Sequence, residues 1–177
     1  MAEPLDVASG SGSPADPADP PETAGDASPV LRRAAPSDAE AIAQLVDRAY
    51  RHYIPLLGRT PTPMLSDFAS AIGEHDVWVL DDGGRLAAVI ELIARPDHLW
   101  VHNVAVDPDR QGRGLGRRLL AFAEAEARRL GLPAVQLLTN ERYLANIAMY
   151  ERYGYRETHR EPYRGTELIH FRKPVAG

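Results

Sequence analysis

The 177-residue sequence contains no cysteine and no apolar run approaching the ~20 residues that a membrane helix needs. The missing cysteine excludes a disulfide framework, a thiolate metal site and a cysteine nucleophile. The N-terminus lacks the basic region and the apolar segment of a secretory signal. We therefore expect a cytoplasmic protein without a membrane partner, and the length suits one domain with a sizeable core.

Lysine and arginine are missing from residues 1–28, which hold six of the 25 acidic residues. Most of this segment consists of alanine, proline, serine, glycine and aspartate, as in "SGSPADPADPPETAGDASP". Such a composition buries too little apolar surface to offset the entropy of ordering. We predict a disordered tail over residues 1–28 and a single domain over residues 29–177. The remainder holds 19 acidic against 20 basic residues, and this near-neutral charge argues against a nucleic-acid partner.

The first half of the domain predicts two helices and three strands after a short initial strand. "VLRRAAPSDAEAIAQLVDRAY" predicts that strand and then a helix opened by a capping box of Ser37 and Glu40. Pro61 and Pro63 precede a second predicted helix near Met64–Ile72. "VWVLDDGGRLAAVIELIA" predicts a hairpin around an Asp-Gly turn, and "HLWVHNVAV" predicts the next strand.

The second half predicts two further helices and three strands. Apolar spacing indicates a helix over Leu115–Leu130, ended by Gly131 and Pro133, and "LANIAMYERYG" predicts another that stops at Gly154. "AVQLLT", "YRETHR" and "TELIHFRK" predict strands. The sum is an α/β domain of the α+β type, with a mixed, mostly antiparallel sheet of about six to seven strands and about four helices.

A glycine-rich loop, "DRQGRGLGRR", lies between a predicted strand and a predicted helix. Glycine lets the backbone approach a ligand closely, and the helix start presents free N–H groups and a positive dipole end. A phosphate or diphosphate suits such a place. The spacing fits neither a P-loop nor the dinucleotide motif G-x-G-x-x-G. The alternative interpretation is a flexible connection with solvated arginines.

Two motifs carry a resemblance to a known family. Gln111–Gly116 matches the Q/R-x-x-G-x-G/A signature of the GNAT acetyltransferase superfamily, and the preceding "NVAVDP" resembles its fourth strand. "NIAMYERYGY", beginning at Asn146, resembles its second signature N-x-A-x-x-Y-x-x-x-G-[FY], with a one-residue difference in the alanine spacing. The resemblance covers residues 30–174. It implies a single GNAT-like domain whose sheet splays between the fourth and fifth strands, and acetyl-CoA as cosubstrate.

The resemblance also implies a set of binding residues. Backbone amides of Gly112–Arg117 would hold the CoA diphosphate, and the backbone of Val104 and Val106 would pair with the pantetheine arm. Asn146 and Tyr150 share a helix face, and the family uses a tyrosine matching Tyr150 to protonate the departing thiolate. The alternative is that Tyr150 is a core aromatic. The candidate cofactor residues are Val104, Val106, Gln111, Gly112, Arg113, Gly114, Leu115, Gly116, Arg117 and Asn146.

Without cysteine, direct attack of an amine on the thioester is the simplest chemistry, and a group must accept the amine's proton. His102 on the fourth strand and Glu91 within "AAVIELIA" are the candidates. A partly exposed strand histidine and a solvated or arginine-paired carboxylate are the alternatives. The histidines show no metal-ligand spacing, and we expect no metal.

The acceptor pocket is expected in "AYRHYIPLLGRTPTPMLSDF", because the resemblance implies that the first two helices form its wall. Tyr50, Tyr53 and Met64 are candidate substrate residues, or else helix core. The prediction is an N-acetyltransferase that moves an acetyl group from acetyl-CoA to a primary amine of a small molecule. A protein or peptide N-terminal acetyltransferase is one alternative, and a non-catalytic acyl-CoA sensor is another. A homodimer is left open.

Overall fold

A seven-stranded sheet of order β1-β2-β3-β4-β5-β7-β6 forms the centre of the computed structural model, which describes residues 28–175. All neighbouring strands are antiparallel except β4 and β5, which are parallel. This confirms the predicted mixed, mostly antiparallel sheet. The strands are β1 (Val30–Arg33), β2 (Asp76–Asp82), β3 (Arg85–Arg95), β4 (His98–Val106), β5 (Ala134–Asn140), β6 (Arg156–Tyr163) and β7 (Thr166–Pro174).

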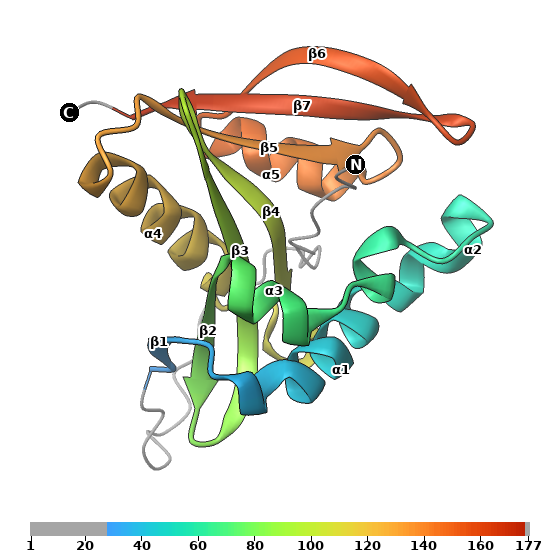
Figure 1. Ribbon diagram of the computed structural model, residues 1–177. Coiled ribbons are helices and arrows are strands. Elements are labelled where there is room, and N and C mark those ends of the chain that lie inside the picture. Colours follow the sequence, from blue (N-terminus) through green and yellow to red (C-terminus); the bar gives the residue numbers. More distant parts are fainter. Residues whose placement is uncertain (1–27, 176–177) are drawn as a thin grey trace, which may run out of the picture.

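The helices lie on both faces of this sheet (Figure 1). The α-helices are α1 (Ala39–Tyr50), α2 (Ile54–Leu57), α3 (Phe68–Glu74), α4 (Leu115–Arg129) and α5 (Leu144–Arg152). The 3-10 turns are η1 (Pro36–Asp38), η2 (Arg51–Tyr53), η3 (Thr62–Leu65) and η4 (Pro108–Arg110). None of the helices within residues 28–175 has the length and hydropathy of a membrane span. The predicted tail lies outside the described residues, apart from Ser28.

Alternate side chains of the central strands divide the core into two layers. The α1/α3 layer packs Ile42 and Leu45 of α1 with Val79 and Val89 of the sheet. The α4/α5 layer packs the apolar faces of these two helices on the opposite side of the same strands. Each fully buried aliphatic side chain contributes about 1.5–3 kcal/mol to folding. The period-2 pattern of the strands therefore fixes which face each helix covers.

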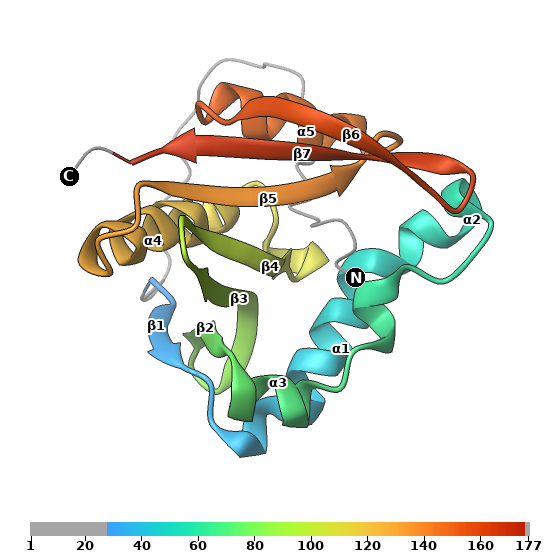
Figure 2. The same cartoon turned by 45° about the horizontal axis from the view of Figure 1, so that its top comes forward.

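The sheet opens between β4 and β5. Their pairing is confined to Leu99↔Val135 and Trp100↔Gln136, and the two strands diverge beyond these pairs (Figure 2). The splay that the resemblance implied is thereby confirmed. On its other edge β4 carries a bulge, because Glu91 pairs with Asn103 whereas Leu92 pairs with Val101. His102 is the extra residue of this bulge.

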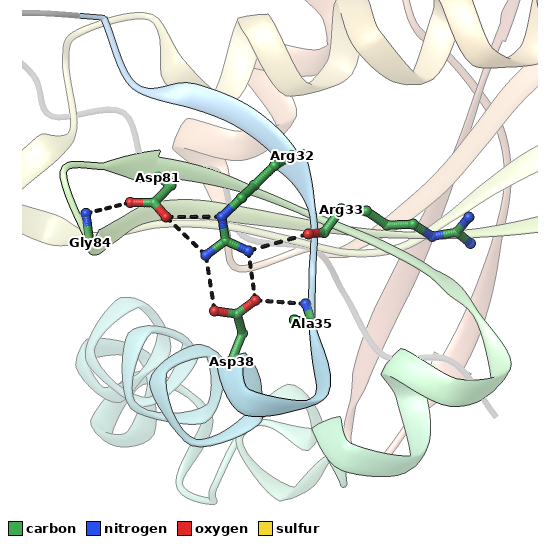
Figure 3. Close-up of polar contacts among 6 residues, drawn as sticks. All are labelled: Arg32, Arg33, Ala35, Asp38, Asp81 and Gly84. Carbon is green, nitrogen blue, oxygen red and sulfur yellow. Dashed lines mark hydrogen bonds and ion pairs between the residues drawn. The ribbon is translucent and has the colours of Figure 1, made fainter.

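Arg32 joins three parts of the fold at the edge of the sheet (Figure 3). Its guanidinium donates to Asp81 of β2 at 2.9 Å and to both carboxylate oxygens of Asp38 at 2.7 and 3.0 Å. The same carboxylates accept the backbone N–H groups of Gly84 and Ala35, each at 2.7 Å. The Arg32 hydrogen bond is the main cause that lowers the pKa of Asp38, against the effect of burial. β1, the hairpin turn and the start of α1 are therefore tied together.

Two local predictions were wrong in detail. The capping box of Ser37 and Glu40 does not open α1, which begins at Ala39 after the 3-10 turn η1; the carboxylate that returns to a backbone N–H is Asp38. The helix predicted near Met64–Ile72 is divided into η3 and α3. Asp67 causes the division, because its side chain caps α3 by accepting the amides of the residues two and three positions further on.

Candidate active site

The glycine loop between β4 and α4 leaves the backbone exposed at Gly112 and Gly114. Gly112 and Gly114 have φ angles of 77° and 75°, in the left-handed region that other residues rarely adopt. Gly114 is the N-cap of α4, so the amides of Leu115–Arg117 belong to the first turn, where a helix has no internal acceptors. A Cβ at either glycine would meet nothing within 4 Å. Gln111 ties the loop to the end of β4, because its Nε2 donates to the carbonyl of Val106 at 3.3 Å.

A buried carboxylate anchors the start of this loop. Asp107 is fully buried, and its Oδ2 accepts from Arg48 of α1 at 2.7 Å while its Oδ1 accepts from the amide of Asp109 at 3.0 Å. Arg85 approaches the same carboxylate at 3.5 Å. Burial alone would raise the pKa of Asp107, but these hydrogen bonds and the two guanidinium charges hold it below its ordinary value. Neither Arg48 nor Asp107 was predicted from the sequence as a site residue.

The surroundings of the loop are basic. A cavity of about 240 Å³ lies against Gly114 and is lined by Arg110, Arg113 and Arg118. Arg110 forms an ion pair with Asp82 at 2.5 Å, which orients its guanidinium. Basic side chains beside a helix start favour a negatively charged ligand, because the helix dipole has the same sign there.

The end of β4 leads from the sheet opening to the loop. Val104 and Val106 lie beyond the last β4–β5 pair, and their side chains are buried in the α4/α5 layer. Among the described residues, this part of β4 has no strand partner on the β5 side. The backbone edge that the resemblance assigns to the pantetheine arm therefore borders the opening. Its contact with a ligand remains a prediction.

Asn146 and Tyr150 both lie on the buried side of α5, as their spacing predicted. The Tyr150 ring packs against those of Tyr155 and Phe171, with centroids 6.1 and 5.7 Å away. Burial, reinforced by Glu124, raises the pKa of Tyr155 well above its ordinary value, so this neighbour stays neutral. Tyr150 is thus held in the α4/α5 layer, and its role as an acid remains a prediction.

The two candidate bases lie in one cluster on the opposite face of the sheet. Glu91 is 3% exposed, and its Oε1 lies 2.5 Å from Nδ1 of His75, at the end of α3. The His75 and His102 rings are 5.9 Å apart. Burial lowers the pKa of His102, although the charge of Glu91 opposes that effect. His75 was not predicted from the sequence as a site residue, because only the fold brings it to Glu91 of β3.

Tyr50 and Tyr53 also face this side of the sheet. The Tyr50 hydroxyl donates to Oδ1 of Asn103 at 3.0 Å, while the Tyr53 ring stacks on Tyr143 at 3.7 Å. Met64 packs at the rim of the same core. Tyr143 follows β5, so the stacked pair links the end of α1 to the far side of the opening. No local sequence pattern marks Asn103 or Tyr143 as a site residue.

The predicted residues therefore fall on two sides of the sheet. The loop residues and Tyr150 belong to the α4/α5 side, and Glu91, His102, Tyr50 and Tyr53 belong to the α1/α3 side. The β4–β5 opening is where these two sides meet. No group of three or more metal-ligating side chains occurs within residues 28–175.

Comparison with known proteins agrees with this arrangement. The ribosomal protein bS18-alanine N-acetyltransferase of Escherichia coli K12 is 37% identical over 91 residues, which span 51% of this chain but only 62% of that enzyme. The S18-alanine enzyme structure from Escherichia coli has a TM-score of 0.69 at 26% identity, covering 84% of this chain and 94% of that one. The S-(2-succino)cysteine N-acetyltransferase of Bacillus subtilis 168 is 34% identical over 141 residues, 72% of this chain and 84% of that enzyme.

A further solved structure concerns the fold alone. YncA of Salmonella typhimurium, a putative acetyltransferase solved with its cofactor acetyl-CoA, has a TM-score of 0.66 at 22% identity and covers 84% of this chain and 95% of its own. The model of the acetyltransferase (GNAT) family matches residues 39–155, from the start of α1 to the end of the second motif. Because this match takes in the glycine loop, the open sheet and both predicted signatures, the chain belongs to the GNAT acetyltransferase family.

Proposed function

We propose that this protein transfers the acetyl group of acetyl-CoA to a primary amine of a small molecule. The observation that carries the proposal is the glycine loop at the start of α4, next to the β4–β5 opening. Family membership and the relative solved with acetyl-CoA support the choice of donor. The left-handed glycines and the open space above them fit a diphosphate held by backbone amides.

The residues divide the chemistry between the two sides of the sheet. Acetyl-CoA supplies a thioester-activated acetyl group to the attacking amine. The amides of Gly112–Arg117 hold the diphosphate. His102, or Glu91 with His75, accepts the proton of the amine directly or through a water, and the Tyr150 hydroxyl donates a proton to the departing sulfur.

A peptide N-terminus is the second candidate acceptor. One relative is named for acetylating an alanine of ribosomal protein bS18, and another for acetylating the amino acid S-(2-succino)cysteine. Both named acceptors are amino-acid amines, which favours an acceptor of this kind over an unrelated polyamine or sugar amine. A non-catalytic acyl-CoA sensor is the remaining alternative.

The release of free thiol tests the proposal. Because the chain contains no cysteine, all thiol that appears with acetyl-CoA comes from CoA itself. The screen uses alkylamines, amino acids and short peptides, with acetyl-CoA binding measured separately by calorimetry. We expect binding together with amine-dependent thiol release. Binding without release over the whole panel would favour the sensor, and the absence of binding would overturn both readings.

A further inference from the structure

Asn103 carries a buried amide group whose hydrogen bonding is only half satisfied. The residue is 3% exposed, and its Oδ1 accepts from the Tyr50 hydroxyl at 3.0 Å. Its Nδ2 has no hydrogen-bond partner among the described residues. Buried amide N–H groups are normally paired, because an unpaired one has lost its water without replacement. The Tyr50 contact orients the amide, so the unpaired donor is fixed in direction.

The position of Asn103 places this donor beside the predicted site of the acceptor amine. Asn103 lies three residues beyond Trp100, the last β4 residue paired with β5, and hence where the sheet is open. It pairs across the β3–β4 ladder with Glu91. Directly opposed residues of an antiparallel pair project from the same face with Cβ atoms about 5 Å apart. A donor and a candidate proton acceptor are therefore neighbours.

This pairing matches one class of amine. An α-amino carbonyl compound carries its amine and a hydrogen-bond-accepting oxygen on adjacent carbons, so one group can face Glu91 while the other faces Asn103. A simple alkylamine has no oxygen for Asn103, and binding it would leave the donor unpaired. Sites with such a buried polar group discriminate against analogues that cannot pair with it.

We propose that Asn103 Nδ2 donates a hydrogen bond to the carbonyl oxygen next to the acceptor amine, so that the acceptor is an α-amino acid or a peptide N-terminus. This inference rests on the proposed acetyltransferase function and specifies its substrate class. Tyr50 acts as a positioning residue that holds the amide of Asn103.

The test compares L-alaninamide with isopropylamine, which replaces the carboxamide by a methyl group. Asn103→Leu removes the donor, and Asn103→Asp removes it while keeping the size and an oxygen for Tyr50. Each change should lower the ratio of kcat/KM for alaninamide to that for isopropylamine by about 10- to 100-fold. Using the ratio cancels general losses of activity. L-Alanine and an alanyl peptide amide, run beside these, distinguish a free amino acid from a peptide end.

Asn140 provides the matched control. It is a buried asparagine whose amide is satisfied at both ends, by Thr166 at 2.8 Å and by the amide of Arg142 at 3.0 Å. Asn140→Leu should leave the substrate ratio within about 3-fold of the parent, since no unpaired donor is lost. Circular dichroism establishes which variants fold.

Two results would overturn the inference while leaving the proposed function intact. One is thiol release by the parent with isopropylamine that equals or exceeds that with alaninamide. The other is an unchanged ratio in a folded Asn103 variant. If neither amine causes thiol release, that result would instead contradict the proposed function, and the inference with it. If Asn103→Leu does not fold, Asn103→Asp and the parent's own preference still decide.

Discussion

The α4/α5 side and the α1/α3 side of the opening differ in how many segments of the chain form them. On the first, a single continuous segment supplies the glycine loop and the helix start, and the groups offered to a ligand are backbone amides. On the second, side chains from distant segments meet: His75 with Glu91, and Tyr50 with Asn103, 53 residues apart. The first side therefore depends on local backbone conformation and the second on the tertiary fold. Left-handed φ angles restrict Gly112 and Gly114 to glycine-like conformations, whereas the other side depends on contacts between buried side chains.

The largest expected effect falls on the backbone side. Gly114→Trp places a bulky side chain where the diphosphate would lie, and should weaken acetyl-CoA binding about 100-fold or more. Gly131→Trp is the matched control, because Gly131 has a similar φ of 70° at the other end of α4 and no atom within 4 Å of an added Cβ. Calorimetry on both folded variants decides. Equal affinities would remove the loop from the cofactor site.

Tyr150→Phe tests whether a side chain also matters on this side. The change keeps the ring packing against Tyr155 and Phe171 and removes only the hydroxyl. General acid catalysis is worth about 10²–10⁴-fold, but a thiolate leaves readily, so we expect a loss of about 10- to 100-fold in kcat. Acetyl-CoA affinity should hardly move. An unchanged kcat would make Tyr150 a packing residue, and weaker binding at constant kcat would make it a binding residue.

A smaller effect is expected from His102, because Glu91, the second candidate proton acceptor, lies in the same cluster. Burial lowers its pKa from the ordinary 6.5, with Glu91 opposing and with His75 and Arg95 adding to the lowering. A base must be deprotonated to accept a proton. The pH profile of kcat/KM should therefore have an ascending limb, below about pH 6.5, that reports the deprotonation of His102. His102→Gln should remove this limb and lower kcat/KM about 10-fold, since Glu91 remains.

The control is the parent protein measured with the same amine, because the ionisation of the amine then affects both pH profiles equally. A limb that persists in His102→Gln would show that His102 is not the group that accepts the proton.

The smallest effect is expected from the N-terminal segment. Deleting residues 1–28 should change the melting temperature by no more than about 2–4 °C, because that composition forms no packed core. Differential scanning calorimetry of both chains measures the change. A larger drop would show that the segment contributes to the folded domain.

The sequence predicted the parts of the molecule that depend on local signals. The hairpin, α4 and the loop follow from turn residues, spacing and glycine, and the open sheet follows from the family motifs. The capping box was wrong because Arg32, brought from β1, fixes the carboxylate of Asp38 instead. Asn103 and His75 carry no local signal, since a strand asparagine and a helix-end histidine gain meaning only from Tyr50 and Glu91 across the fold.

The two carboxylates that hold α1 make this helix sensitive to acid. Asp38 lies at its start with Arg32, and Asp107 receives Arg48 from its last turns. Both carboxyl groups have lowered pKa values, so their contribution is complete above the ordinary aspartate range and is lost as the pH falls through the folded values. Acidification would therefore weaken the contacts at both ends of α1. Because Asp107 also accepts the Asp109 amide at the start of the glycine loop, the same acidification would reach from α1 to that loop.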